Sequence, residues 1–191
     1  MKSAFLFPTE VYEDYISNID NTQLIEECRK IYSEKNTPVQ VSNNGGWQSR
    51  PLSEPVGPVT EKLIAEIQSR LKVIYEKLGN SRTPKLSNYW FNVNNRNNYN
   101  ISHNHTLAFF SCTYYVKCPV NCGDLILERQ DDSEFFLQFF EQENEYTAQA
   151  LMLEPEESKL VIFPSWVRHS VGQNLTTDNN DARISIAFNF I

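Results

Sequence analysis

Two stretches in the first half of the chain carry apolar residues at the three- and four-residue spacing of an amphipathic helix. The first places an apolar face on Leu24, Ile25, Cys28, Ile31 and Tyr32. The second is longer and repeats the pattern at Leu63, Ile64, Ile67, Leu71, Ile74, Tyr75 and Leu78. Asp20 with Gln23 resembles a capping box at the start of the first stretch, and Gly79 is a typical stop after the second. The pattern predicts two helices whose apolar faces pack on a core.

After residue 85 the pattern changes to short runs of β-branched and aromatic residues, which predict strands. Clusters of Asn, Gly, Pro and Asp separate these runs, which read KLSNYWFNVN, AFFSCTYYVKCP, GDLILER, SKLVIFPSW and ARISIAFNFI. Residues 129–153 fit neither period and are compatible with a helix or a strand. Two helices followed by many strands predict a mainly β fold in which helices cover one face of a jelly-roll barrel. We expect one domain over residues 1–191, with a helical support region over 1–85 and a jelly-roll core over 86–191.

Composition and charge narrow the classes of function. With 40% hydrophobic and 13% aromatic residues among 191, the chain is expected to fold as a globular domain. Its net charge of −7 disfavours nucleic acid as a partner. No apolar run has the length of a membrane span, and the first residues lack the apolar segment of a signal peptide. We therefore expect a soluble, cytoplasmic protein without a membrane partner; the sequence predicts no particular oligomeric state.

The histidines are few and unevenly spaced. His103 and His105 lie one residue apart, and the third, His169, follows the strand-like FPSW segment. Side chains two apart in a strand point to the same face, so the pair can face one interior together. Imidazole is the commonest metal-binding side chain, although short histidine pairs also arise by chance in exposed loops. A metal site is therefore one of two interpretations of the pair alone.

The last predicted strand has two different faces. Its apolar face consists of Ile184, Ile186, Phe188 and Phe190, and its other face of Arg183, Ser185, Ala187 and Asn189. If the apolar face covers the core, Arg183 points into the barrel, where an unpaired guanidinium would be costly. Its planar fork matches a carboxylate, which either the protein or a ligand could supply. The two possibilities remain open at this point.

Four motifs together resemble one enzyme family. They are GGWQS at 45–49, SHNHTLAFFSCTYYVKCP at 102–119, FPSWVRHSV at 163–171 and ARISIAFN at 182–189. These motifs resemble those of the 2-oxoglutarate- and Fe(II)-dependent oxygenases, in particular a group from bacteria and phages. The resemblance implies a double-stranded β-helix, that is, a cupin-like jelly-roll barrel with supporting helices. It also implies a dioxygenase that uses Fe(II), 2-oxoglutarate and O2, releases succinate and CO2, and hydroxylates an unidentified substrate.

The resemblance assigns metal ligands residue by residue. His103 matches the first iron ligand of the family and His169 the distal one. His105 stands where better-known relatives have an aspartate, so the usual set of two histidines and one carboxylate is altered. We favour His105 as the third ligand, because it has the correct spacing. A carboxylate from elsewhere, such as Asp124 or Glu128, is the alternative.

The resemblance also assigns the residues that bind the cosubstrate. In the relatives, the arginine after the distal histidine holds the far carboxylate of 2-oxoglutarate, aided by the hydroxyl of the R-x-S motif. These roles map to Arg183 and Ser185, and the tyrosine contact of prolyl-hydroxylase-like members maps to Tyr115. Further pocket residues are expected at Asn92, Asn189 and Trp90.

Two other functions compete with this one. A cupin-type metalloenzyme could use the three histidines without 2-oxoglutarate, and Arg183 would then have no functional role. A non-catalytic jelly-roll binding module would tolerate the loss of all three histidines. The oxygenase is favoured because the metal set and the R-x-S motif occur together.

Overall fold

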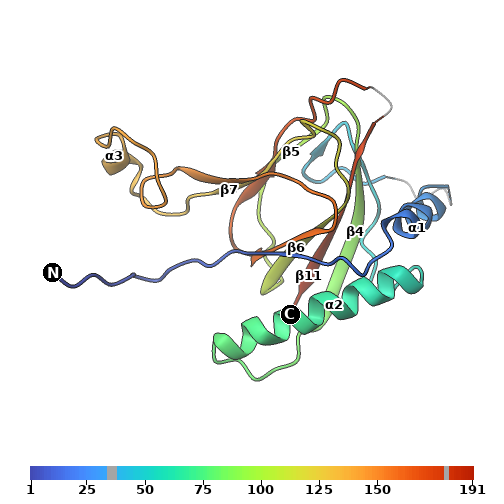
Figure 1. The fold of residues 1–191 in the computed structure, drawn as a ribbon, viewed down its shortest axis with the longest axis horizontal. Coiled ribbons are helices and arrows are strands. Elements are labelled where there is room, and N and C mark those ends of the chain that lie inside the picture. Colours follow the sequence, from blue (N-terminus) through green and yellow to red (C-terminus); the bar gives the residue numbers. More distant parts are fainter. Residues whose placement is uncertain (34–37, 179–180) are drawn as a thin grey trace.

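The strands expected from the sequence form two antiparallel sheets (Figure 1). A computed structural model describes residues 1–33, 38–178 and 181–191. The helices are α1 (Asn21–Ser33), α2 (Pro58–Lys77) and α3 (Glu134–Leu137). The strands are β1 (Tyr12–Tyr15), β2 (Asn43–Asn44), β3 (Trp47–Gln48), β4 (Leu86–Asn94), β5 (Tyr99–His103), β6 (Phe110–Lys117), β7 (Leu125–Glu128), β8 (Ala150–Leu153), β9 (Lys159–Pro164), β10 (His169–Val171) and β11 (Arg183–Phe190).

The larger sheet has six strands in the order β1-β9-β6-β11-β4-β3, and the smaller has five in the order β2-β5-β10-β7-β8. Every pairing between these strands is antiparallel. Successive strands along the chain alternate between the sheets from β4 to β7 and from β8 to β11, which is the connectivity of a jelly roll. The mainly β fold expected from the sequence is therefore confirmed.

One face of the larger sheet is packed against α1 and α2. The apolar side of β11 contributes Ile186, Phe188 and Phe190 to this core, all of them fully buried. Burying one such side chain stabilises the fold by about 1.5–3 kcal/mol. The alternation on β11 thus places its polar side on the opposite face of the sheet, toward the smaller sheet.

Helix α1 begins and helix α2 ends where the sequence indicates. Asp20 Oδ1 accepts a hydrogen bond from the backbone N–H of Gln23 at 3.1 Å, which caps α1. The carboxylate of Glu27 on α1 accepts the backbone N–H groups of Val59 and Thr60, each at 3.0 Å, and so caps α2 from outside that helix. Gly79 follows α2 with a φ of 76°, a conformation that favours glycine.

The first 85 residues contain more than the two expected helices. β1 extends one edge of the larger sheet, β3 extends the other edge, and β2 extends the smaller sheet. Strands of two to four residues are too short to show a period of two, so the sequence pattern did not reveal them. The region expected to be a helical support therefore also contributes to both sheets.

Residues 129–149 form an arm that projects from the sheets between β7 and β8 (Figure 1). The arm contains the one-turn helix α3 and several turns, which explains why its sequence fits neither a helical nor a strand period. Among the described residues, none of the helices is both long and apolar enough to cross a bilayer.

Candidate active site

A cavity of about 280 Å³ lies between the two sheets. Its walls bring together every side chain that the sequence assigned to the site: His103, His105, His169, Arg183, Ser185, Tyr115, Asn92, Asn189 and Trp90. These residues come from β4, β5, β6, β10 and β11 and from the loop after β5. Antiparallel pairing thus gathers into one cavity residues that are up to about a hundred positions apart.

The three histidines form a cluster at one end of the cavity. His103 ends β5 and lies directly opposite His169, the first residue of β10. Their ring centroids are 4.2 Å apart, and the ring of His105 lies 5.2 Å from His103 and 5.0 Å from His169. One nitrogen from each ring can be chosen so that all three lie within 4.8 Å of one another. This spacing is compatible with one metal ion bound by three imidazoles.

The loop after β5 positions His105, which differs from the sequence-based expectation. His103 and His105 were expected to share a strand face, but β5 ends at His103. The backbone N–H of His105 instead donates to the carbonyl of Ser165 at 2.9 Å, within the FPSW turn. Contact with this turn, and not strand alternation, brings His105 into the cluster.

Each histidine uses its Nδ1 atom for a hydrogen bond within the protein. His103 Nδ1 lies 2.9 Å from the carbonyl oxygen of Ile101, and His169 Nδ1 lies 3.0 Å from that of Val167. A carbonyl oxygen can only accept, so the proton is on Nδ1 and the Nε2 lone pair is free. Metal-bound histidines have the same arrangement, in which an outer partner fixes the tautomer and the ring.

A side-chain network fixes the ring of His105. Its Nδ1 lies 2.6 Å from Asn189 Oδ1 and 3.0 Å from Ser111 Oγ. The amide of Asn189 is oriented by its Nδ2, which donates to Asn88 Oδ1 at 3.0 Å. Ser111 Oγ also donates to Asn189 Oδ1 at 2.9 Å and lies 2.9 Å from Ser165 Oγ. The oxygen of Asn189 therefore accepts the Nδ1 proton of His105, and the Nε2 atom of His105 remains unprotonated.

Burial keeps the histidines neutral, the state that a metal requires. Burial lowers the pKa of His169 to about 3, and the neighbouring His103 adds to the effect. Burial also lowers the pKa of His103 and of His105 from the usual value of 6.5. At neutral pH, each of the three rings is therefore uncharged and has one nitrogen with a lone pair that a metal ion could bind.

The two carboxylates considered as alternative ligands lie outside this cluster. Among the described residues, the only group of three potential metal ligands is that of the histidines. Glu128 accepts a hydrogen bond from Ser102, the neighbour of His103 whose side chain points the other way, and forms an ion pair with Arg168 at 3.7 Å. The potential metal ligands that lie together in the structure are thus three imidazoles, without a carboxylate.

Arg183 lies in the same cavity and is 2% exposed. Its Nη1 donates to the backbone carbonyls of Cys122 and Gly123, at 2.7 and 2.8 Å. Among the described residues, no carboxylate forms an ion pair with it, so of the two possibilities left open by the sequence, a structural ion pair within the protein is not found. Burial lowers the pKa of Arg183, but a guanidinium stays charged at neutral pH.

Glycine is required at position 123 for this arrangement. Gly123 has a φ of 89°, and a Cβ there would lie 2.1 Å from the carbonyl oxygen of Gly172. Any other residue would push the turn away from β10 and so move the two carbonyls that hold Arg183. The turn between β6 and β7 therefore fixes the guanidinium in place.

The register of the larger sheet arranges the cavity floor in rows across β6, β11 and β4. The first row is Ser111, Asn189 and Asn88, the second is Thr113, Ala187 and Trp90, and the third is Tyr115, Ser185 and Asn92. Directly opposed side chains on one face lie about 4.5–5.5 Å apart. The first row contacts His105, whereas the third borders Arg183, and between them is the small side chain of Ala187.

Several contributors to the site were not predicted from the sequence. Ser165 and Asn88 belong to the network around His105, and the carbonyls of Cys122 and Gly123 hold Arg183. Alternation with Trp90 and Asn92 could have indicated that Asn88 faces the cavity. Main-chain carbonyls carry no such signal. Asn189, expected among the residues of the cosubstrate pocket, also contacts His105.

The sequence matches a model of one protein family. Residues 88–189 match a family of 2OG-Fe(II) oxygenases, and this region contains every residue of the histidine cluster and of the cavity floor. No curated protein matches the chain in sequence.

Solved structures with little sequence identity share the fold. A Pseudomonas putida prolyl-4-hydroxylase superposes with a TM-score of 0.68 at 15% identity, over 95% of this chain and 92% of that one. A viral collagen prolyl hydroxylase from Paramecium bursaria Chlorella virus-1, in complex with 2OG, gives 0.60 at 12% identity over 94% of each chain. A Trichoplax adhaerens prolyl hydroxylase, solved with a peptide fragment of hypoxia inducible factor, gives 0.63 at 12% identity over 95% and 83%. The chain belongs to the 2OG-Fe(II) oxygenase family, whose enzymes use Fe(II), 2-oxoglutarate and O2.

Proposed function

We propose that the Nε2 atoms of His103, His105 and His169 hold the iron, and that Arg183 binds the distal carboxylate of 2-oxoglutarate. One observation carries this proposal: three imidazoles with engaged Nδ1 atoms converge in a cavity that also contains a buried guanidinium. The bound iron supplies, with O2 and 2-oxoglutarate, the oxidation that hydroxylates a C–H bond of the substrate and releases succinate and CO2.

The residues around Arg183 complete the binding of the anion. Tyr115 and Ser185 lie side by side next to Arg183, and their hydroxyls can donate to a carboxylate. Burial raises the pKa of Tyr115, so its hydroxyl keeps the proton that it donates. The apolar side chains of Leu125 and Phe163 also line the cavity and limit the access of water.

The test is an anaerobic titration of the protein with Fe(II) and 2-oxoglutarate, which follows the visible charge-transfer band of the bound pair. We expect a band in the parent protein. Arg183→Ala should weaken 2-oxoglutarate binding about ten- to a hundredfold, because a hydrogen bond to a charged group contributes roughly 1.5–3 kcal/mol. Arg183→Lys should restore binding only in part, since an ammonium lacks the planar fork.

Arg168→Ala is the matched control, because this arginine is half-exposed and contacts Glu128 and Ser102 outside the cavity. It should bind 2-oxoglutarate like the parent protein. Iron content is measured in every variant. Unchanged 2-oxoglutarate affinity in Arg183→Ala at equal iron content would overturn the role of Arg183 and favour a cupin-type metalloenzyme.

A further inference from the structure

The arm (residues 129–149) leaves the smaller sheet at the end where the histidines lie. His169 on β10 is opposite Leu127 on β7, which in turn is opposite Leu151 on β8. The next residue, Glu128, donates its backbone N–H to the carbonyl of Arg168 at 2.9 Å. The arm therefore begins one or two residues beyond the level of the candidate metal centre.

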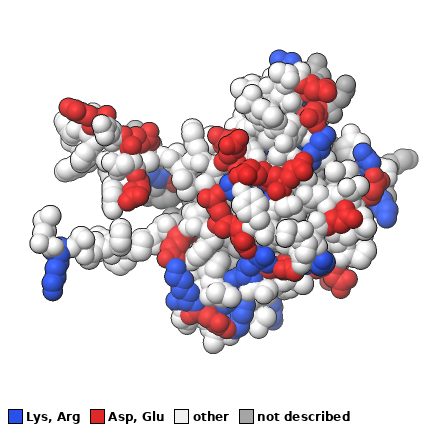
Figure 2. Space-filling view, in the orientation of Figure 1, with Lys and Arg blue, Asp and Glu red and all other residues white. Residues whose placement is uncertain are grey.

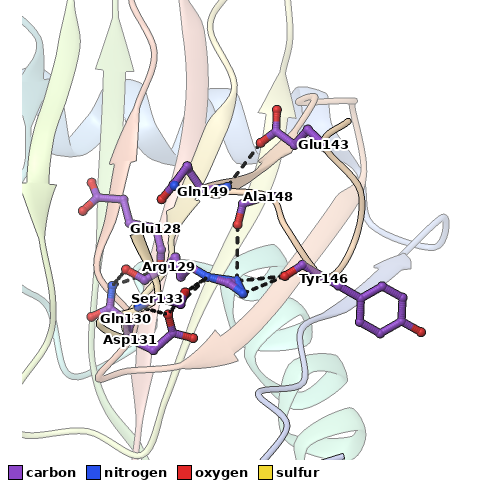
Figure 3. A network of polar contacts seen from close by, with 9 residues as sticks. All are labelled: Glu128, Arg129, Gln130, Asp131, Ser133, Glu143, Tyr146, Ala148 and Gln149. Atoms are coloured by element: carbon purple, nitrogen blue, oxygen red, sulfur yellow. Dashed lines mark hydrogen bonds and ion pairs between the residues drawn. The ribbon is translucent and has the colours of Figure 1, made fainter. Parts of the chain in front are cut away.

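Hydrogen bonds within the arm give it a defined shape (Figure 3). Arg129 Nη2 donates to the carbonyl of Tyr146 at 2.8 Å, and its Nε donates to Ser133 Oγ at 3.0 Å. The backbone N–H of Gln149 donates to Glu143 Oε1 at 3.2 Å. Arg129 thus ties both ends of the arm together.

The arm exposes aromatic side chains that nothing in the described chain covers. The exposed fractions are 70% for Phe135, 69% for Phe136, 69% for Phe139 and 58% for Phe140. Phe135 and Phe140 line an open groove of about 610 Å³, together with Glu143. Exposed apolar surface of this kind, bordered by polar residues, is typical of an interaction site.

The arm is also strongly acidic. Its exposed carboxylates are Asp131, Asp132, Glu141, Glu143 and Glu145. Its single basic residue, Arg129, is bonded within the arm. Figure 2 shows acidic side chains gathered on this projection. A ligand of the groove must therefore combine apolar groups with positive charge, which excludes phosphate-rich polymers and anionic lipid surfaces.

Exposed apolar residues also lie on the two segments that carry His105 and His169. Trp166 is 52% exposed in the FPSW turn, and Leu107 is 88% exposed in the loop that carries His105. The two segments are joined by Asn104, whose Nδ2 donates to the carbonyl of Trp166 at 3.4 Å. A chain that is bound in the groove and also contacts Trp166 and Leu107 would pass close to the histidine cluster, because the arm starts at the level of His169.

We propose that the arm docks the substrate of the oxygenase, and that this substrate is a polypeptide segment in which lysine or arginine residues alternate with apolar residues. This inference rests on the function proposed above and adds the class of substrate. The phenylalanines would bury the apolar side chains, and the exposed carboxylates, chiefly those of Asp132, Glu141 and Glu145, would pair with the cations. Surface charge complementarity mainly raises the association rate and is weakened by salt.

The test uses two pools of fluorescein-labelled synthetic peptides, one built from Lys, Leu, Val, Pro and Ser and the other with Glu in place of Lys. Fluorescence anisotropy should show at least tenfold tighter binding of the lysine pool, and weaker binding at higher salt. Two arm variants should each weaken that binding at least tenfold. In the phenylalanine variant, four residues are changed to Ser: Phe135, Phe136, Phe139 and Phe140. In the carboxylate variant, the changes are Asp131→Asn, Asp132→Asn, Glu141→Gln, Glu143→Gln and Glu145→Gln.

The control variants are Val73→Ser and Glu61→Gln, both exposed on α2, which packs on the outer face of the larger sheet. They should bind the peptides like the parent protein. Equal binding of both pools, or arm variants that bind like the parent, would overturn the proposal. So would a parent dimer that the phenylalanine variant converts to a monomer in sedimentation, because a second copy would then occupy the groove.

The Fe(II) and 2-oxoglutarate titration separates this proposal from the previous one. The arm variants should keep the charge-transfer band, since none of the changed residues lines the cavity. A parent protein without the band would contradict the proposed function. A parent protein with the band but without preference for the lysine pool would contradict the docking proposal alone.

Discussion

At the scale of single residues, His105 differs from the other two histidines in what fixes its ring. Main-chain carbonyls accept from His103 and His169, whereas the amide of Asn189 accepts from His105. In the better-known relatives of the oxygenase family, an aspartate occupies the position of His105 and supplies a negative charge. Here a neutral imidazole takes its place, and in the proposed metal site its strength as a ligand would depend on a side chain that a single substitution can remove.

We expect Asn189→Ala to lower the affinity for Fe(II) about ten- to a hundredfold, because His105 then loses the acceptor that sets its tautomer. His105→Ala, which removes the ligand itself, should have a larger effect. Isothermal titration with Fe(II) under anaerobic conditions measures both. Thr113→Ala is the control, since Thr113 lines the cavity without contacting a histidine. Equal Fe(II) affinity in Asn189→Ala and Thr113→Ala would contradict the role of Asn189.

At the scale of elements, β11 holds the site together because its polar face spans the whole cavity floor. Arg183 is at one end of this face and Asn189 at the other, with Ala187 between them. Ala187 lies opposite Thr113 on β6 and Trp90 on β4. A small residue in the middle row leaves room between the histidine cluster and the guanidinium.

Ala187→Leu should therefore weaken 2-oxoglutarate binding at least tenfold, while Fe(II) affinity stays the same. The added carbons would fill the space above the middle row, whereas the histidines keep their own hydrogen bonds. Ala187→Gly, which adds no volume, should bind 2-oxoglutarate like the parent protein, at a cost in stability of about 0.5–1 kcal/mol. The charge-transfer titration measures cosubstrate affinity, and urea unfolding measures stability. Retained 2-oxoglutarate affinity in Ala187→Leu would show that the cosubstrate does not cross this row.

The elements also show which features a single sequence can predict. The alternation on β11 correctly separated the core face from the cavity face, because strand geometry translates a period of two directly into two faces. The loop position of His105 and the carbonyl contacts of Arg183 were not predictable, since both depend on main-chain contacts between distant segments. The arm has no period, and only its composition marks it as distinct.

At the scale of the whole molecule, the neutral histidines, of which His169 is buried, link folding to pH. The pKa of His169 is about 3 in the folded state, against 6.5 as its usual value. Below about pH 6.5 the unfolded chain therefore binds a proton that the folded chain does not, so acid favours unfolding. The stability that the neutral histidine preserves is present above pH 6.5 and is lost progressively as the pH falls toward 3.

For the metal-free protein, we expect the free energy of unfolding to fall with decreasing pH below about 6.5. His169 should account for about 1.4 kcal/mol of this fall for each pH unit. The measurement is urea unfolding at several values between about pH 7 and pH 5. His169→Gln cannot take up this proton, so its stability should depend less steeply on pH. The carboxylates contribute equally to the pH dependence of both proteins. If the unfolding free energies of the parent protein and of His169→Gln fall in parallel with pH, the prediction is contradicted.

The two carbonyl contacts of Arg183 affect how the site can distinguish 2-oxoglutarate from succinate. They fix the guanidinium in place in the absence of an anion, so little side-chain entropy would be lost if a carboxylate binds there as proposed. Succinate, the coproduct, has the same distal carboxylate as 2-oxoglutarate, and this rigid end of the cavity cannot distinguish the two. Discrimination must then arise at the histidine end, where 2-oxoglutarate has a keto group that succinate lacks. Product inhibition by succinate is thus expected to be competitive with 2-oxoglutarate, and its strength is set by the metal.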